Sequence, residues 1–179
     1  MKSPPAISDE RQILMRKAAS VARYVELAEV SLGALNAELL APMADVVSFA
    51  PLTPRIGSKS SFVFEENEQR ILVRISVKFS LIGPSKKSSR SPLLVVSCDF
   101  DLSYLFRVEG APTGEIRDEL FAAFADINGT YNAWPYVREL VQNTVVRMGL
   151  PPFVLPVYKP ATFQLSTPVT VGGPTDTGK

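Results

Sequence analysis

Two stretches of the chain alternate between apolar and polar residues over most of their length. Residues 70–83 and 93–106 repeat with a period of two, which predicts β-strands with one buried and one wet face. Their apolar positions are Ile71, Val73, Ile75, Val77, Phe79 and Leu81 in the first and Leu94, Val96, Cys98, Phe100, Leu102, Tyr104 and Phe106 in the second. Both stretches exceed the usual strand length, so we expect an antiparallel pair whose buried face needs a substantial covering layer.

A third stretch, residues 132–148, repeats its apolar residues every three or four positions, as an amphipathic helix does. The stripe consists of Trp134, Val137, Leu140, Val141, Val145 and Met148. The expected ends are Asn132, a residue type that caps free N–H groups, and Gly149, which two prolines follow. Pro135 then falls in the first turn, where a proline removes no hydrogen bond. We expect the stripe to cover the sheet.

Two further helices are predicted. Ser8, followed by two acidic residues, is a typical N-cap for a helix over residues 9–23. Its thin apolar seam suits packing on the domain edge or on a partner subunit, and a solvated helix equally well. The other helix covers residues 113–126 and precedes a turn at Asn128 and Gly129. Its seam consists of Ile116, Leu120, Phe121 and Phe124.

Three segments complete the sheet. Residues 24–38 alternate imperfectly, which is typical of an edge strand, and residues 60–65 predict a short strand. The connection between them, residues 39–58, contains three prolines but many large apolar residues. It either folds over the core or lines a surface that binds something apolar. The apolar side of the first strand is expected to carry Ala28, Val30, Leu32 and Ala34, and that of the short strand Phe62 and Phe64.

The composition narrows the class of protein. With 179 residues and 46% hydrophobic content, the chain is long enough for one domain with a core. Lys plus Arg number 19 and Asp plus Glu 18, so the net charge of +1 would attract neither nucleic acid nor acidic lipid. The basic cluster of Lys86, Lys87 and Arg90 lies in a Ser-rich loop and is interpreted as a solvated hairpin tip. We expect no nucleic-acid partner.

Residue types that carry catalysis are scarce. The absence of histidine removes the commonest general base and zinc ligand. The single cysteine, Cys98, cannot form an internal disulfide and is interpreted as a small buried hydrophobe, consistent with a reducing cytoplasm. Asp99 and Asp101 share one strand face, which we interpret as a solvated face, not a metal or acid–base site. We therefore expect no catalytic residue, metal or cofactor, and predict a protein that is not an enzyme.

The N-terminus and the hydropathy pattern bear on the location. Residues 1–12 lack an apolar core of the kind that a secretory signal needs, and no uninterrupted apolar run approaches about 18 residues. Neither a signal nor a membrane span is therefore expected, and we predict a cytoplasmic protein.

Aromatic residues gather outside the long strands. They are Phe49, Phe62, Phe64, Trp134, Tyr136, Phe153, Tyr158 and Phe163. These rings either complete the core beneath the long connection or line a groove. Because hydrophobic transfer is non-directional, a groove of this kind would bind extended apolar segments with little sequence preference and without a nucleotide.

One run of sequence resembles a known family. The motif W-P-Y-V-R-E-L on the main helix, followed by M-G-L-P-P-F-V-L-P, is similar to the C-terminal half of the SecB-like protein-export chaperones. The resemblance extends back over the strands and covers roughly residues 25–163. It implies an α+β fold, namely a four-stranded antiparallel sheet with helices on one face. It also implies a dimer of dimers that holds unfolded polypeptides in long grooves without ATP, and the export form delivers them to SecA.

The resemblance, with the aromatic excess, assigns expected roles to residues. The client-binding groove would be formed by Met43, Val47, Phe49, Leu52, Ile56, Phe62, Phe64, Trp134, Phe153 and Tyr158. The oligomer interface would be formed on the main helix by Val137, Val141, Val145 and Met148. Asp99 falls at a SecA-facing place, whereas Ser31 and Leu35 stand where export-type members carry acidic residues.

The expected organisation is an N-terminal extension with a helix over residues 1–24, a SecB-like domain over 25–165 and a flexible tail over 166–179. The near-neutral charge and the N-terminal helix look more like the divergent members that protect an antitoxin in toxin–antitoxin–chaperone systems. The expected function is an ATP-independent holdase for unfolded or nascent chains, with a cognate antitoxin or SecA as further partners. The alternative is an oligomeric scaffold, or a carrier of a small apolar ligand, without chaperone activity.

Overall fold

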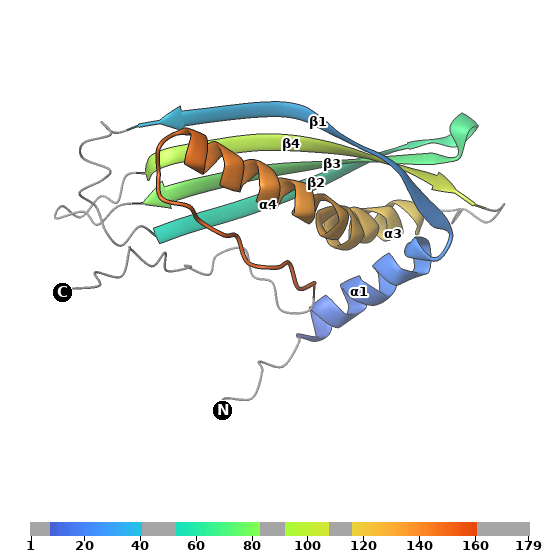
Figure 1. The fold of residues 1–179 in the computed structure, drawn as a ribbon. Helices are drawn as coiled ribbons and strands as arrows, with labels where there is room; N and C mark the ends of the chain where they lie inside the picture. The colour runs from blue at the N-terminus through green and yellow to red at the C-terminus, as the bar shows by residue number, and fades with distance from the viewer. Residues whose placement is uncertain (1–7, 41–52, 83–91, 108–115, 161–179) are drawn as a thin grey trace, which may run out of the picture.

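The chain forms one four-stranded antiparallel sheet with helices on a single face (Figure 1). The computed structural model describes residues 8–40, 53–82, 92–107 and 116–160. The strand order is β1-β4-β3-β2, so β1 and β2 are the edges. The predicted fold class, including the N-terminal helix, is confirmed. In chain order the elements are α1 Asp9–Ala22, β1 Val25–Leu39, β2 Thr53–Glu65, η1 Glu66–Glu68, β3 Arg70–Ile82, β4 Pro92–Phe106, α3 Arg117–Phe124, η2 Ala125–Gly129 and α4 Thr130–Arg147.

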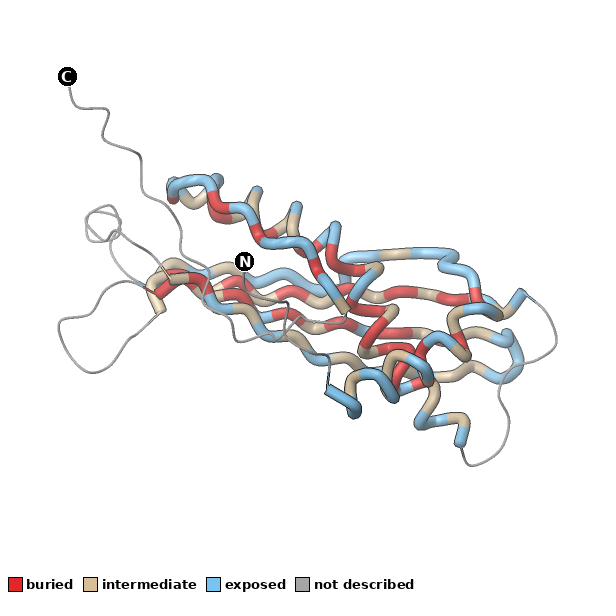
Figure 2. The backbone as a smooth tube through the Cα atoms, turned by 90° about the horizontal axis from the view of Figure 1, so that it is seen from below, coloured by how far each residue is buried: buried red, intermediate tan, exposed pale blue. Residues whose placement is uncertain are grey.

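The core lies between the central strands and the helices. The predicted apolar positions of β3 and β4 point to the covered face, called the inner face here, and all but Phe106 are buried (Figure 2). The strands pair so that Ile75 lies opposite Phe100. The opposite, outer face carries the polar positions of the same strands. The two alternating stretches therefore form the antiparallel pair that the sequence predicts, and this pair lies at the centre of the sheet.

Strand β2 is twice as long as the sequence suggests. It begins at Thr53 and pairs with β3 from Thr53 opposite Ile82 to Glu65 opposite Arg70. Residues 53–58, assigned above to the long connection, therefore belong to the sheet, and Ile56 points to its inner face. The sequence did not predict this part of β2 because it contains Pro54 and Gly57, two residue types that are depleted in strands. Proline is tolerated here because β2 is an edge strand.

Strand β1 departs from simple alternation at two irregularities, one between Leu27 and Glu29 and one between Leu32 and Ala34. Leu32 lies opposite buried Phe100, but Ala34 lies opposite Asp99 on the outer face. The predicted apolar face is therefore wrong beyond Leu32. A β-bulge adds one residue to one strand and so shifts the faces.

Helices α3 and α4 form one continuous path joined by the π-helix η2, so the turn predicted at Asn128 and Gly129 is wrong. Glycine is required here by close approach to the sheet, because a Cβ at Gly129 would lie 2.7 Å from Cγ1 of Val73. The expected cap, Asn132, lies inside the path and donates from Nδ2 to the hydroxyl of Tyr104 at 3.0 Å.

Pro135 likewise lies inside α4 instead of in a first turn. Because proline lacks an N–H group, it cannot make the usual bond to the carbonyl four residues earlier. A π-helix and an internal proline are both known causes of helix bending, and this helical path contains one of each.

Helix α1 packs against α3 and η2. Its cap is as predicted, with the N–H of Arg11 donating to Oγ of Ser8 at 3.3 Å. Ala18 is buried with Ala123 and Ile127. Helix α1 therefore packs on the edge of the domain and is not the solvated helix that the sequence also allowed.

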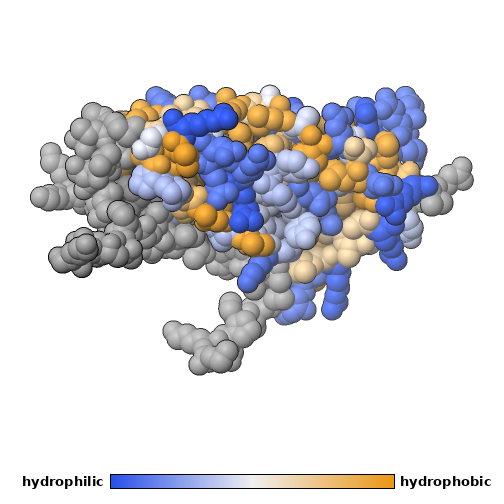
Figure 3. Space-filling model, viewed as in Figure 1, coloured by the Kyte–Doolittle hydropathy of each residue, from blue (hydrophilic) through white to orange (hydrophobic). Residues whose placement is uncertain are grey.

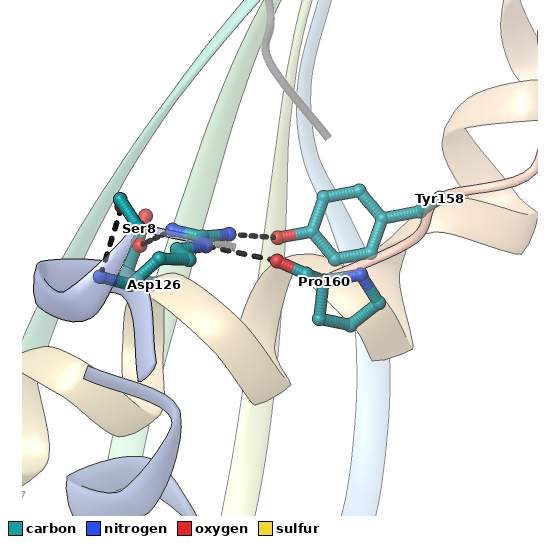
Figure 4. A network of polar contacts seen from close by, with 5 residues as sticks. Ser8, Asp126, Tyr158 and Pro160 are labelled. Carbon is teal, nitrogen blue, oxygen red and sulfur yellow. Dashed lines mark hydrogen bonds and ion pairs between the residues drawn. The ribbon is translucent and has the colours of Figure 1, made fainter. Parts of the chain in front are cut away.

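Arg11 joins three segments that are far apart in sequence (Figure 4). Its guanidinium donates to Oδ2 of Asp126 at 3.1 Å, to the hydroxyl of Tyr158 at 3.2 Å and to the carbonyl of Pro160 at 2.8 Å. These bonds hold α1, η2 and the C-terminal segment together.

The segment that follows α4, residues 150–160, is extended and lies along the helix. Phe153 stacks on Phe79 with ring centroids 5.5 Å apart, and Leu155 is buried. The carbonyls of Pro156 and Leu155 accept bonds from Nε1 of Trp134 and Nε of Arg138 at 2.8 and 2.9 Å. The segment thus completes the cover on one flank of α4.

Several predictions fall outside the described residues. They concern the tail over 166–179, the first three residues of the helix predicted over 113–126, and a set of single residues. That set is Met43, Val47, Phe49, Leu52, Lys86, Lys87, Arg90 and Phe163.

Candidate functional site

The inner face of the sheet is covered unevenly. The inner rows of the central strands are buried, whereas those of both edge strands retain exposed surface. Strand β2 sends Ser58 and Ser60 to the inner face as well as three large apolar residues, Ile56, Phe62 and Phe64, and we call these three the β2 row. We call the three exposed leucines of β1 on the same face, Leu27, Leu32 and Leu35, the β1 row. Both rows are apolar and border the layer of helices, so each is a candidate binding surface.

The β2 row is half-buried and ends in a cluster of aromatic rings. The centroid of the Phe121 ring lies 6.0 Å from that of Phe62 and 5.1 Å from that of Phe64. Phe106 lies within 6.1 Å of both Phe64 and Phe121, and the guanidinium of Arg117 lies 5.1 Å from the Phe64 centroid. The rings of Phe62 and Phe64 therefore pack on core residues on one side, and both rings remain partly open to solvent.

Three other predicted groove residues lie deeper. Trp134, Phe153 and Tyr158 are 3%, 5% and 5% exposed, so within the described chain they contribute to the core and not to an accessible surface. The rings of Trp134 and Tyr158 pack with centroids 5.6 Å apart. The predicted groove residues thus fall into three groups. The β2 row is partly accessible, and Trp134, Phe153 and Tyr158 are buried. The other four lie outside the described ranges.

The β1 row is more open than the β2 row. Leu27, Leu32 and Leu35 are 37%, 47% and 46% exposed although they lie opposite Tyr104, Phe100 and Cys98 on the inner face. Hydrophobic surface is visible along β1 and beside α4 in Figure 3. The row was missed because the bulges break the alternation that a sequence reading relies on.

The predicted interface residues of α4 face the chain's own sheet. Val137, Val141 and Val145 are fully buried, and Met148 is partly buried. The flank of α4 that borders β1 carries Tyr136, which is 44% exposed and whose ring centroid lies 6.2 Å from that of Phe100. A partner that approaches α4 would therefore meet Tyr136 and not the three valines.

Among the described residues, the titratable groups form no reactive centre. On the outer face, Arg74 donates to both carboxylate oxygens of Asp101 at 2.7 and 2.9 Å, and these hydrogen bonds lower the pKa of that carboxyl. Asp99 lies on the same face. Burial raises the pKa of the Cys98 thiol to about 11 and that of the Tyr104 hydroxyl to about 12, so both stay protonated and unreactive near neutrality.

The described residues provide neither a metal site nor a membrane-spanning helix. They contain no group of three or more potential metal ligands. None of the described helices combines the length and the hydropathy needed to cross a bilayer.

Comparison with known proteins gives a structural match only. No protein-family model and no curated protein matches the chain. The chain is similar to the solved structure of the Mycobacterium tuberculosis Rv1957 SecB-like chaperone in complex with a ChAD peptide from the Rv1956 HigA1 antitoxin. The match has a TM-score of 0.64 and 21% identity, and covers 80% of this chain and 97% of the other.

A protein of unknown function from Streptococcus agalactiae matches with 12% identity and a TM-score of 0.34, over 74% of this chain and 96% of the other. That score is too low to support an argument. The match to Rv1957, in contrast, extends over most of both chains. The chain therefore has the fold of a SecB-like chaperone.

Proposed function

We propose that the chain is an ATP-independent holdase chaperone of the cytoplasm, which binds extended apolar segments of unfolded or nascent polypeptides on the inner face of its sheet. The observation that carries the proposal is the incomplete cover of that face at both edges. Apolar rows that a monomer leaves open are typical of surfaces that bind other polypeptides. The fold similarity to a SecB-like chaperone supports the same function.

The β2 row is the proposed client surface. Its aromatic rings are held on one side by Phe121, so they present a fixed apolar surface that needs little ordering when a client binds. Each 100 Å² of apolar surface that a client buries would contribute about 2.5 kcal/mol, without any requirement for a defined sequence. Such binding suits clients that share only exposed apolar side chains.

The β1 row is the proposed contact with a second copy of the chain. It is continuous with the exposed flank of α4 at Tyr136, and it lies along an edge strand whose outward N–H and C=O groups could pair with another strand. Self-association through this strip would seal it and leave the β2 row for clients. A dimer of dimers is the proposed assembly.

The proposed native client is an antitoxin. Rv1957 was solved with a peptide of the HigA1 antitoxin, and a protein of the same fold could hold a cognate antitoxin in the same manner. Delivery to SecA is not part of this proposal, because Ser31 on the outer face of β1 stands where the resemblance implies an acidic residue. Protection of one antitoxin from proteolysis, with no co-purification with SecA at low salt, is the expected result.

The test is suppression of the aggregation of a chemically denatured client, measured by light scattering without ATP. The wild-type chain should suppress aggregation at near-stoichiometric ratios, and Phe62→Ser with Phe64→Ser should abolish suppression. Val63→Ser, on the outer face between them, is the matched control and should retain it. Circular dichroism and sedimentation must show that the double variant stays folded and assembled.

Two outcomes would overturn the proposal. A wild-type chain that does not suppress aggregation would favour the oligomeric scaffold or the carrier of an apolar ligand. Loss of suppression together with loss of assembly in the double variant would mean that Phe62 and Phe64 are core residues and not a client surface.

A further inference from the structure

None of the described helices covers the outer face of the sheet (Figure 1). On this face acidic and basic residues lie on different strands. Strands β1 and β4 carry its acidic residues, and β2 and β3 carry its basic residues, apart from Glu65, which is paired with Arg70. The acidic residues are Glu26, Glu29, Glu38, Asp99 and Asp101, and the basic residues are Arg55, Lys59, Arg70, Arg74 and Lys78. Half of one face is therefore positive although the chain is nearly neutral.

Three of these cations make no ion pair with any described residue. Arg74 and Arg70 are bound by carboxylates, whereas Arg55, Lys59 and Lys78 are exposed and have none among the described ranges. We call these three residues the cation triangle. Lys78 is a diagonal neighbour of both Arg55 and Lys59, at about 8 Å, so an anion bound among the three would be attracted by more than one cation.

The geometry of the cation triangle follows from the strand register. Lys78 lies opposite Gly57, which separates Arg55 from Lys59 on β2. Arg55 and Lys59 are therefore about 13 Å apart along the strand, with Lys78 between them on the next strand. A Cβ built on Gly57 meets nothing within 4 Å, so the space above the centre of the triangle is open.

Protection of a sheet edge does not account for the triangle. Lysines on an edge strand can deter pairing with other strands, which would explain Lys59. Lys78, however, lies on β3, which is paired on both sides. The cluster therefore extends inward from the edge.

An apolar depression lies next to the cation triangle on the same face. It has a volume of about 370 Å³, and its outer-face lining consists of Ser61, Val63, Leu72, Arg74 and Asp101. Val63 is 60% exposed, although exposing an apolar side chain to water is unfavourable. Val63 follows Lys59 by four residues, so the depression continues the line of the triangle along β2.

We propose that this surface is a docking site for an acidic polypeptide segment that carries one apolar anchor residue. The anchor would occupy the depression on Val63 and Leu72, and carboxylates further along the segment would meet Lys59, Lys78 and Arg55. The distance from Val63 to Arg55 corresponds to about eight extended residues. This surface faces away from the β2 row, so its partner binds independently of the client.

The experiment measures binding of a labelled peptide to the full-length chain by fluorescence anisotropy. The probe is a peptide of about nine residues with Leu first, Glu at the fifth, seventh and ninth positions and Ser or Gly elsewhere. A matched probe has Gln in place of each Glu. The acidic probe should bind at least about tenfold more tightly than its amide counterpart, and its affinity should fall as salt is added.

Variants locate the site. Lys59→Glu with Lys78→Glu should weaken the acidic probe by about tenfold or more, because two attractions become repulsions. Arg16→Glu with Arg147→Glu makes the same change of net charge on exposed helical positions and should change affinity by less than about twofold. Val63→Ser should weaken both probes. Aggregation suppression should stay unchanged in the lysine variant, which separates this site from the proposed client surface.

Four results would overturn the proposal. They are equal affinity for the acidic and amide probes, equal weakening by the two charge-reversal variants, and the absence of binding up to about 1 mM probe. The fourth is tighter binding of a single-stranded oligonucleotide that the lysine variant abolishes, since this would assign the cation triangle to nucleic acid.

Discussion

Strands β1 and β3 each send an apolar row to the inner face of one sheet, but only one of these rows is covered. Ile71, Val73 and Ile75 of β3 are at most 1% exposed beneath the helices. Leu32 and Leu35 of β1 point to the same face and are nearly half exposed. The two rows are similar in apolar character. They differ in whether helices pack against them. A row that folding does not cover is available for another polypeptide.

The largest expected effect is on the covered row. Ile75→Ala should lower the free energy of unfolding by about 2–5 kcal/mol, because a fully buried side chain leaves a cavity in a close-packed core. Urea denaturation followed by the fluorescence of Trp134, the single tryptophan, measures it at fixed protein concentration. A loss below about 1 kcal/mol would show that the cover over β3 is loose.

A second effect tests how closely the helical layer approaches the covered row. Gly129→Ala should cost about 1–3 kcal/mol, because its Cβ would lie 2.7 Å from Cγ1 of Val73. Gly57→Ala on the outer face is the matched control and should be close to neutral, since its Cβ meets nothing within 4 Å. Equal unfolding midpoints for the two variants would contradict the packing of η2 on β3.

Substitutions in the exposed β1 row should affect the assembly of the chain more than the stability of a single subunit. Leu32→Ser with Leu35→Ser should change the stability of the isolated subunit by about 1 kcal/mol or less, since both side chains already contact water. The same variant should shift sedimentation velocity toward smaller species. An unchanged sedimentation coefficient would show that β1 does not carry the contact between copies.

The smallest expected effect is on the outer face and depends on pH. The pKa of Asp101 is lowered by its hydrogen bonds to Arg74, so the ion pair stabilises the fold above the unfolded pKa and loses this contribution as pH falls through the folded pKa. Asp101→Asn should therefore lower the urea midpoint slightly at neutral pH and not at strongly acidic pH. A difference that is equal at both pH values would contradict this assignment.

The central strands could be predicted because their inner-face positions are all apolar and alternate with mostly polar ones. Both faces of β3 and β4 are specified by residue type alone, and burial follows that pattern. The ends of α1 were predicted for a similar reason, since Ser8 and its acidic neighbours act locally. The agreement is good wherever a local signal decides the structure.

The remaining features depend on contacts between distant residues. Asn128 and Gly129 have the sequence of a turn, but the close approach of the helical layer to Val73 requires glycine inside a helix. The start of β2 contains Pro54 and Gly57, and pairing with β3 overrides their weak strand propensity. The imperfect alternation of β1 and Gly33 indicate an irregular strand, but they do not fix where the register shifts, and so the exposed leucine row could not be located from the sequence.

The candidate site was predicted in part for the same reason. An excess of aromatic residues can be counted in the sequence, but which rings are covered depends on the path of residues 150–160. That segment buries Phe153 and Tyr158 and contacts Trp134, whereas nothing described covers Phe62 and Phe64 fully. Composition thus indicated an excess of apolar rings, and only packing shows which of them stay accessible.

Photocrosslinking tests most directly whether the uncovered inner rows bind unfolded polypeptide. A photoreactive phenylalanine analogue would replace Phe62 or Phe64 on the inner face, or Val63 on the outer face of the same strand, in the presence of a denatured client. We expect crosslinks from positions 62 and 64 and few from position 63. Equal crosslinking from both faces, or crosslinks from position 63 alone, would contradict it.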